Sequence, residues 1–399
     1  MSYKKVLLVL MSIMAIFSSA VFAQEQTQSN PVIDADYPGG NISIYNLRGQ
    51  IVLDDTVYMR QELRDTEWWW FYWNFRVRGA ESKTLYFKFR LPHPRSGILP
   101  FGTQGPAVSV DGGNSWSWLG GDAVKDDAFS YTFAPDAGEV RFCFTIPYQQ
   151  SDLNKFINRH KDNPHFFIKE LCKTRKGRAV NQLQVGNLDG EPKYRILLTA
   201  RHHACESIAS YVLEGILEAV LANTIEGHWF RENVEILAIP LIDVDGVEDG
   251  DQGKLRIPHD HNRDYEGESI YLSVASLRRL VPSWSQGKLR IAIDLHCPYI
   301  NTPFIYFSDP TEGDQEFNKK FRKILTKVQN GSLTFINDEH RISSGKGLMK
   351  GWAAGLPGVE VASTLEIPYG NVGDAVVTAE SARLLGHDLA KTMKAYLQE

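Results

Sequence analysis

From about residue 181 onward, short apolar runs of strand length alternate with longer segments whose apolar residues recur at helical spacing. Strands that are buried on both faces and separated by helices form a mostly parallel sheet, which helices cover on both sides. The sequence therefore predicts an α/β domain with a mixed, mostly parallel sheet. The apolar runs are residues 194–200 (YRILLTA), 233–242 (NVEILAIPLI) and 289–294 (LRIAID), and the helical patterns are residues 206–222 and 378–397.

The N-terminal half has a different pattern, in which short strand-like runs are divided by turn residues such as those at 111–114 (DGGN). Strands this close together, with no helical pattern between them, predict an antiparallel β-sandwich. We therefore expect a sandwich over residues 24–160 and the α/β domain over residues 161–399. The strand-like runs are residues 85–89 (LYFKF), 107–110, 116–119 and 140–146 (VRFCFTI).

Residues 67–77 (EWWWFYWNFRV) form the most aromatic run of the chain. In a strand, alternate residues of this run point to opposite faces. Such aromatics could stack on a carbohydrate ligand, or they could be covered on both faces by the sandwich core and the neighbouring domain. We favour packing, because aromatic side chains of this size dominate cores and interfaces.

The first residues have the pattern of a secretory signal peptide: Lys4 and Lys5 precede an apolar run at residues 6–17, and small residues follow at 18–23 (SSAVFA). The apolar run is shorter than the about 20 residues that span a bilayer. We therefore expect cleavage after Ala23 and a secreted or periplasmic protein. No later run is long and apolar enough to predict membrane insertion.

The net charge of −5 argues against a nucleic-acid partner, because such proteins are usually basic. The four cysteines are too few and too scattered for a disulfide framework, although one or two bridges remain open.

Four polar segments follow predicted strands, at the sheet edge where open α/β folds bind ligands. In the first, at residues 200–207 (ARHHACES), His203 and Glu206 are three residues apart and can share one face of a turn. An imidazole nitrogen and a carboxylate suit Zn²⁺, which keeps one position open for water in catalytic sites. On its own, a histidine and a glutamate at this spacing more often lie on the surface of a helix than bind a metal ion. His202 competes as a ligand, and we expect a structural role for it.

The second segment, residues 243–265, ends with Asn262 and Arg263, whose guanidinium can bind a carboxylate bidentately. Asp260 could accept the second ring N–H of a metal-bound histidine. A solvated loop held by ion pairs is the alternative interpretation.

The third segment is a strand that ends on His296, and the fourth, residues 362–370 (ASTLEIPYG), places Glu366 among apolar and small residues. His296 could be an ordinary core histidine or the third ligand of a His-Glu-His zinc site. A carboxylate such as Glu366 is costly to bury unless it is paired or functional, so it is either a buried ion pair or a general base.

The order of these four segments resembles the zinc carboxypeptidase family, whose founders are the pancreatic carboxypeptidases. The resemblance covers residues 66–399 and is greatest to the branch of the cytosolic carboxypeptidases and their bacterial relatives. That branch also has an N-terminal β-sandwich that ends in a proline-tyrosine segment, which residues 142–156 (FCFTIPYQQSDLNKF) resemble. The domain at residues 161–399 is then the catalytic one.

The resemblance implies hydrolysis of the C-terminal peptide bond of a peptide or protein by a water molecule, which zinc activates while it polarises the carbonyl group. It implies one Zn²⁺ per chain and these residue roles: His203, Glu206 and His296 as ligands, Asp260 supporting His203, Asn262 and Arg263 binding the terminal carboxylate, and Glu366 as the base.

Two features depart from the family pattern. The arginine that stabilises the oxyanion has two candidates here, Lys254 and Arg256, and we favour Arg256, with Lys254 as a substrate-binding residue. The family's mobile tyrosine has no counterpart, because residues 341–361 contain no Tyr.

The region that lines the family's side-chain pocket, residues 340–352 (HRISSGKGLMKGW), carries Arg341, Lys346 and Lys350. A basic pocket would favour an acidic C-terminal residue. Cleavage of cell-wall peptides at the same zinc site, deacylation of small N-acyl amino acids and a non-catalytic binding module are the alternative functions. The intact set of ligands and base argues against the last of these.

Overall fold

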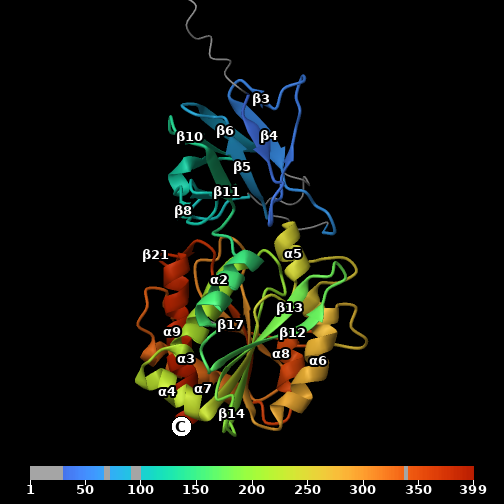
Figure 1. The fold of residues 1–399 in the computed structure, drawn as a ribbon, viewed down its shortest axis with the longest axis vertical. Coiled ribbons are helices and arrows are strands. Elements are labelled where there is room, and N and C mark those ends of the chain that lie inside the picture. Colours follow the sequence, from blue (N-terminus) through green and yellow to red (C-terminus); the bar gives the residue numbers. More distant parts are fainter. Residues whose placement is uncertain (1–29, 67–71, 91–99, 337–339) are drawn as a thin grey trace, which may run out of the picture.

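The computed structural model describes residues 30–66, 72–90, 100–336 and 340–399, and it contains a β-sandwich above a larger α/β part (Figure 1). The predicted signal peptide and residues 67–71 of the aromatic run lie outside the described residues. The predicted fold class, an N-terminal sandwich followed by a carboxypeptidase-like α/β/α domain, is confirmed.

Two sheets face each other in the sandwich. All their strand pairs are antiparallel except β4–β6, which is parallel because β5 lies between them in sequence but in the opposite sheet. The first sheet is β1 (Val32–Asp34), β5 (Asn74–Arg78), β11 (Glu139–Cys143), β7 (Ala107–Ser109) and β8 (Ser117–Trp118). The second is β2 (Ser43–Ile44), β4 (Thr56–Arg60), β6 (Thr84–Phe89), β10 (Ala128–Thr132) and β9 (Val124–Lys125), with β3 (Val52–Leu53) on β4 and the 3-10 turn Gly121–Ala123 before β9.

Aromatic rings fill the space between the two sheets. Trp73 and Phe75 are fully buried, and both pack against Phe129, whose ring lies 4.9 Å from that of Phe87. Tyr72 is also buried, and its hydroxyl donates to the Gly39 carbonyl at 2.5 Å. For the described part of the aromatic run, the packing interpretation therefore holds.

The α/β part is built on an eight-stranded sheet in which the central strands run parallel. Apolar residues bury both faces of β14, β15 and β16, which correspond to the three predicted apolar runs. In order across the sheet, the strands are β12 (Phe166–Lys173), β13 (Ala179–Gly186), β15 (Val234–Ile239), β14 (Tyr194–Ala200), β16 (Leu289–His296), β19 (Val361–Glu366), β17 (Tyr306–Pro310) and β18 (His340–Ser343).

Helices cover this sheet on both sides (Figure 1). One layer contains α3 (Ser207–Leu221), α4 (Ile225–Asn233), α7 (Gln315–Val328) and α9 (Ala379–Gln398), and the other contains α6 (Leu272–Ser285) and α8 (Met349–Ala354). Thr378 is the N-cap of α9, since its side chain accepts from the Ser381 N–H. Smaller elements are α2 (Gln150–His160), α5 (Val244–Asp249), the 3-10 turn His261–Arg263 and the hairpin β20 (Asn371–Val372) and β21 (Ala375–Val376).

The proline-tyrosine segment joins the two parts. The Tyr148 hydroxyl donates to Glu214 on α3 at 2.7 Å, and Tyr211 and Ser207 of the same helix donate to the carbonyls of Pro147 and Ile146 at 2.7 and 2.6 Å. Helix α2 ends at His160, the residue at which we expected the sandwich to end, and strand β12 begins at Phe166. The exact domain boundary stays a prediction.

In the described part of the chain, no single helix is long and apolar enough to cross a membrane. Helices α3 and α4 meet that criterion only as a pair bent by 87°, and α3 is buried in the core.

Candidate active site

Two loops and two strand ends bring the predicted polar residues to one edge of the sheet. The loop after β14 carries His203 and Glu206, directly before α3 begins at Ser207. His296 and Glu366 are the last residues of β16 and β19, where they are paired across the parallel ladder. The carboxyl ends of these neighbouring strands therefore supply the site, as expected for an open α/β sheet.

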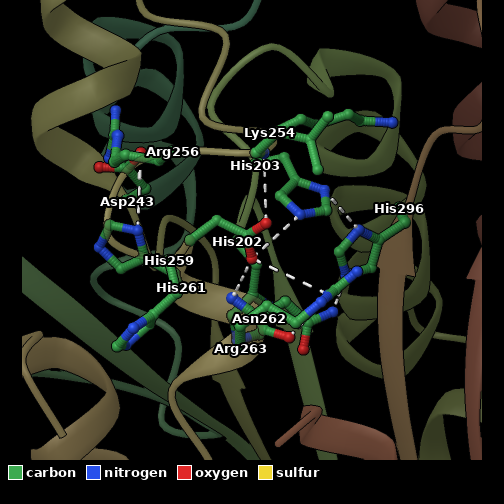
Figure 2. Close-up of polar contacts among 12 residues, drawn as sticks. His202, His203, Asp243, Lys254, Arg256, His259, His261, Asn262, Arg263 and His296 are labelled. Atoms are coloured by element: carbon green, nitrogen blue, oxygen red, sulfur yellow. Dashed lines mark hydrogen bonds and ion pairs between the residues drawn. The ribbon is translucent and has the colours of Figure 1, made fainter. Parts of the chain in front are cut away.

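Three side chains converge with their ligand atoms facing one another. The Nδ1 atom of His203 lies 3.0 Å from Glu206 Oε1 and 3.2 Å from His296 Nδ1, and His296 Nδ1 lies 2.8 Å from Glu206 Oε2. Figure 2 shows the His203 and His296 rings turned toward each other. All three residues are buried, with Glu206 fully so.

This arrangement fits a tetrahedral zinc ion. Two nitrogens at about 2.0–2.1 Å from such an ion would be about 3.3–3.4 Å apart, close to the separation of the two Nδ1 atoms. Glu206 Oε2 is a buried atom that accepts no hydrogen bond among the described residues. Burial alone would raise the pKa of Glu206, but Lys254, His296 and His203 hold it well below its ordinary value. An ionised carboxylate and two imidazole nitrogens are thus available to a metal ion.

The predicted support of His203 is in place. Asp260 Oδ1 lies 3.5 Å from His203 Nε2, and the same carboxylate accepts the backbone N–H groups of Asn262 and Leu255. Burial opposes ionisation of Asp260, but the nearby His203 ring lowers the pKa of this carboxyl well below its ordinary value. A fixed carboxylate behind the ring holds Nε2 as the protonated nitrogen and leaves Nδ1 free to bind metal.

The structure brings Lys254 to this group and leaves Arg256 outside it. Lys254 Nζ lies 2.8 Å from Glu206 Oε1 and donates to the Cys297 carbonyl at 2.7 Å. Arg256 instead pairs with Asp243 at 2.6 Å (Figure 2). It also pairs with Asp251 at 2.9 Å and with Asp65 of the sandwich. Three carboxylates turn the Arg256 guanidinium toward the domain junction, so its position does not support the preference for Arg256 over Lys254, which stays a prediction.

Asn262 and Arg263 differ in what surrounds them. Asn262 is buried, its Nδ2 donates to Asp294 at 3.1 Å and lies 3.0 Å from His296 Nε2, and its Oδ1 accepts the Met349 N–H at 2.9 Å. These contacts place the Asn262 amide behind His296. The Arg263 side chain is 50% exposed, and its Nη1 donates to the Asn262 carbonyl, so most of its guanidinium is open to solvent.

Glu366 ends β19 and is paired with His296 across the parallel ladder. Its Oε2 is buried without a hydrogen-bond partner among the described residues. Burial raises the pKa of Glu366 above its ordinary value, and His296 and Lys254 oppose this shift only in part. A carboxyl group whose pKa is raised toward neutrality can both take up and release a proton.

Two further features of the site were not predicted. Asp294 lies two residues before His296 on β16, so both side chains point to one face, and Asp294 Oδ2 lies 2.6 Å from His296 Nε2. The D-x-H spacing on a strand was the signal for this pair. Tyr306 of β17 is paired directly across from Glu366, a register that the sequence could not supply.

Comparison with known proteins shows similarity to zinc carboxypeptidases. The family model described as zinc carboxypeptidase matches residues 153–267. Cytosolic carboxypeptidase 6 of Caenorhabditis elegans is 25% identical over 303 residues, which are 67% of this chain and 62% of that protein. Cytosolic carboxypeptidase 2 of Xenopus tropicalis is 20% identical over 304 residues, which are 70% of this chain and 31% of that protein. The chain thus spans less than two thirds of the length of these relatives.

Two solved structures share the fold over nearly their whole length. A metallo-carboxypeptidase from Burkholderia cenocepacia has a TM-score of 0.78 at 16% identity and covers 92% of this chain and 99% of its own. A metallo-carboxypeptidase from Pseudomonas aeruginosa, in complex with (2-guanidinoethylmercapto)succinic acid, has a TM-score of 0.74 at 18% identity with the same coverage. The predicted resemblance to the zinc carboxypeptidases is therefore confirmed by the family model over residues 153–267, and the solved structures share the fold.

Proposed function

We propose that the protein is an active metallocarboxypeptidase that releases single residues from the C-terminus of peptides or proteins. The observation that supports this most is the convergence of two imidazole Nδ1 atoms on the Glu206 carboxylate, beside a Glu366 oxygen that has no hydrogen-bond partner among the residues that the structure describes. His203, Glu206 and His296 would hold one Zn²⁺. Bound there, zinc would polarise the scissile carbonyl and lower the pKa of a water molecule.

Side chains of the protein bind the substrate, transfer the proton and stabilise the oxyanion. Arg263, with its exposed guanidinium, binds the terminal carboxylate of the substrate. Glu366 accepts a proton from the attacking water and delivers it to the leaving amine nitrogen. Lys254 stabilises the oxyanion that forms on the scissile carbonyl, in the role that we first expected for Arg256.

We further propose a preference for acidic C-terminal residues, on the basis of Lys350. This side chain is buried, and its Nζ donates to Ser308 Oγ at 2.7 Å and Ser343 Oγ at 2.9 Å. Within the described residues it forms no ion pair, and burial lowers its pKa to about 8. Ser308 is paired with Thr364, two residues before Glu366. A carboxylate on the last residue of a substrate would neutralise this buried charge.

Export is also a proposal, on the strength of the N-terminal pattern of two lysines, an apolar run and small residues. We expect the mature protein to begin at Gln24 and to be recovered outside the cytoplasm. N-terminal sequencing of the fractionated protein checks this, and an uncut chain in the cytoplasm would contradict it.

The proposed activity predicts that zinc-loaded protein removes one residue at a time from free-acid peptides and leaves amidated peptides intact. Glu366→Gln should lower kcat/KM by at least about 10²-fold, because it removes the base while keeping the size of the side chain. Mass spectrometry of the digests, with a chelator as a second control, gives the answer. A failure of zinc-loaded protein to cleave any peptide would favour cell-wall peptides or ligand binding.

The acidic preference predicts faster release of Glu or Asp than of Leu from otherwise identical peptides. Lys350→Met should remove most of this advantage, whereas Lys346→Met should not, because the Lys346 side chain is 73% exposed and pairs with Glu266. Since Lys350 is charged below its pKa, the advantage should also decline as the pH rises through about 8. Equal rates for Glu-ending and Leu-ending peptides at pH 7 would disprove the preference.

The assignment of Lys254 predicts that Lys254→Met lowers kcat/KM by about 10²–10³-fold, the usual loss for an oxyanion-stabilising donor. Lys254→Arg should keep a larger share of the activity. Arg256→Lys is the matched variant and should change kcat/KM less than tenfold, because Arg256 faces Asp65, Asp243 and Asp251. An equal loss in Arg256→Lys, with folding and zinc content intact, would return the role to Arg256.

A further inference from the structure

A chain of buried hydrogen bonds lies behind His296, on the side of the ring away from the other two ligands. The Tyr265 hydroxyl lies 2.8 Å from His202 Nε2, His202 Nδ1 lies 2.8 Å from Asp294 Oδ1, and Asp294 Oδ2 lies 2.6 Å from His296 Nε2. Tyr265 is 4% exposed, His202 and Asp294 are fully buried and His296 is 2% exposed. We call Tyr265, His202 and Asp294 the positioning chain.

The positioning chain determines which ring nitrogen of His296 carries the proton and which is available to bind metal. Because His296 Nδ1 faces Glu206 and His203, the ring must carry its proton on Nε2 in order to bind metal through Nδ1. That N–H donates to Asp294 Oδ2. A carboxylate acceptor at this position fixes both the tautomer and the plane of a ligand ring.

The Asp294 carboxylate is itself prevented from rotating. Its Oδ1 accepts from His202 Nδ1 and from the Thr199 hydroxyl, both at 2.8 Å, and its Oδ2 accepts from Asn262 in addition to His296. When His202 donates through Nδ1, its Nε2 is left to accept the Tyr265 O–H in the neutral ring. Each polar atom of the chain thus has a partner.

His202, Asp294 and His296 also lie close enough together to hold an ion of their own. Such an ion would require both His202 Nδ1 and His296 Nε2 to give up the hydrogen bonds that they make with Asp294. His296 would then have to bind metal through both ring nitrogens at once. The group with Glu206 has no such conflict, because it uses Nδ1 of both histidines, and their Nε2 atoms keep their contacts with Asp294 and Asp260.

We propose that Tyr265, His202 and Asp294 are positioning residues that fix the His296 ring and thereby raise the affinity of the site for zinc. His202 and His203 are neighbours in the loop after β14, so one loop supplies a ligand and also supports the ligand of the adjacent strand. This gives His202 a defined role in place of the general structural role that the sequence suggested. The inference depends on the zinc site, and its test does not depend on peptide hydrolysis.

Zinc titration of the full chain in competition with a chromogenic chelator tests the proposal. His202→Gln should weaken zinc binding by about 10–100-fold, the usual effect of losing a support behind a ligand. Tyr265→Phe should cause a smaller loss of zinc affinity. The aromatic ring at position 265 should still pack against Trp352, whose ring centroid lies 5.4 Å from that of Tyr265. Tyr271→Phe is the matched control: its hydroxyl donates to the His259 carbonyl at 2.6 Å, outside the positioning chain, so zinc affinity should stay within twofold.

A further measurement separates positioning from simple structural support. The visible spectrum of the cobalt-substituted protein should change in His202→Gln and stay unchanged in Tyr271→Phe, because only the former alters the ligand field. If His202→Gln does not fold, Tyr265→Phe carries the test. Zinc affinity within twofold of the parent in both variants, with only the zinc-free protein destabilised, would overturn the proposal.

The stoichiometry distinguishes the remaining alternatives. Two zinc ions per parent chain that fall to one in His202→Gln would make His202 a ligand and overturn the proposal. A parent chain that binds no zinc would instead contradict the zinc site itself.

Discussion

The rest of the site depends on the burial of the Glu206 carboxylate between two imidazole rings. An isolated buried carboxylate costs several kcal/mol, so the fold must supply opposite charge or a metal ion to compensate. Lys254 at 2.8 Å supplies one positive charge, and the two Nδ1 atoms leave a position for a cation. The neighbouring Glu366, whose pKa burial raises, lies at the same edge of the sheet.

The β-sandwich contributes to this site through its junction with the α/β part. Thr66 forms a β-bridge with Arg256, the Ile257 N–H donates to the Asp65 carbonyl at 3.1 Å, and Arg256 pairs with the Asp65 carboxylate. The loop that carries Lys254 is therefore held from the sandwich side. The sandwich also contacts Lys254 itself, because the Thr66 hydroxyl donates to the Lys254 carbonyl at 3.3 Å.

Local spacing was enough to predict part of the site from the sequence. His203 and Glu206 lie three residues apart before a helix, and His296 ends a buried apolar run, so their place at the sheet edge followed from the strand pattern. The choice between Lys254 and Arg256 could not be made in this way. Both lie in a loop without periodicity, and the direction of each side chain depends on partners that are distant in sequence.

The sequence also did not show which polar side chains are buried. Lysine side chains usually point to solvent, and this holds for Lys346 but not for Lys350, which is 2% exposed. The chain behind His296 was missed for a related reason: Tyr265 lies 63 residues from His202 in sequence, and only the folded sheet brings the two together.

The most direct test of the central claim is to add zinc stepwise to metal-free protein and to follow both bound zinc and the release of C-terminal residues. Activity should be absent without metal, rise in proportion to bound zinc and reach its maximum at one ion per chain. Full activity in metal-free protein, or an activity that rises only with a second bound ion, would contradict it.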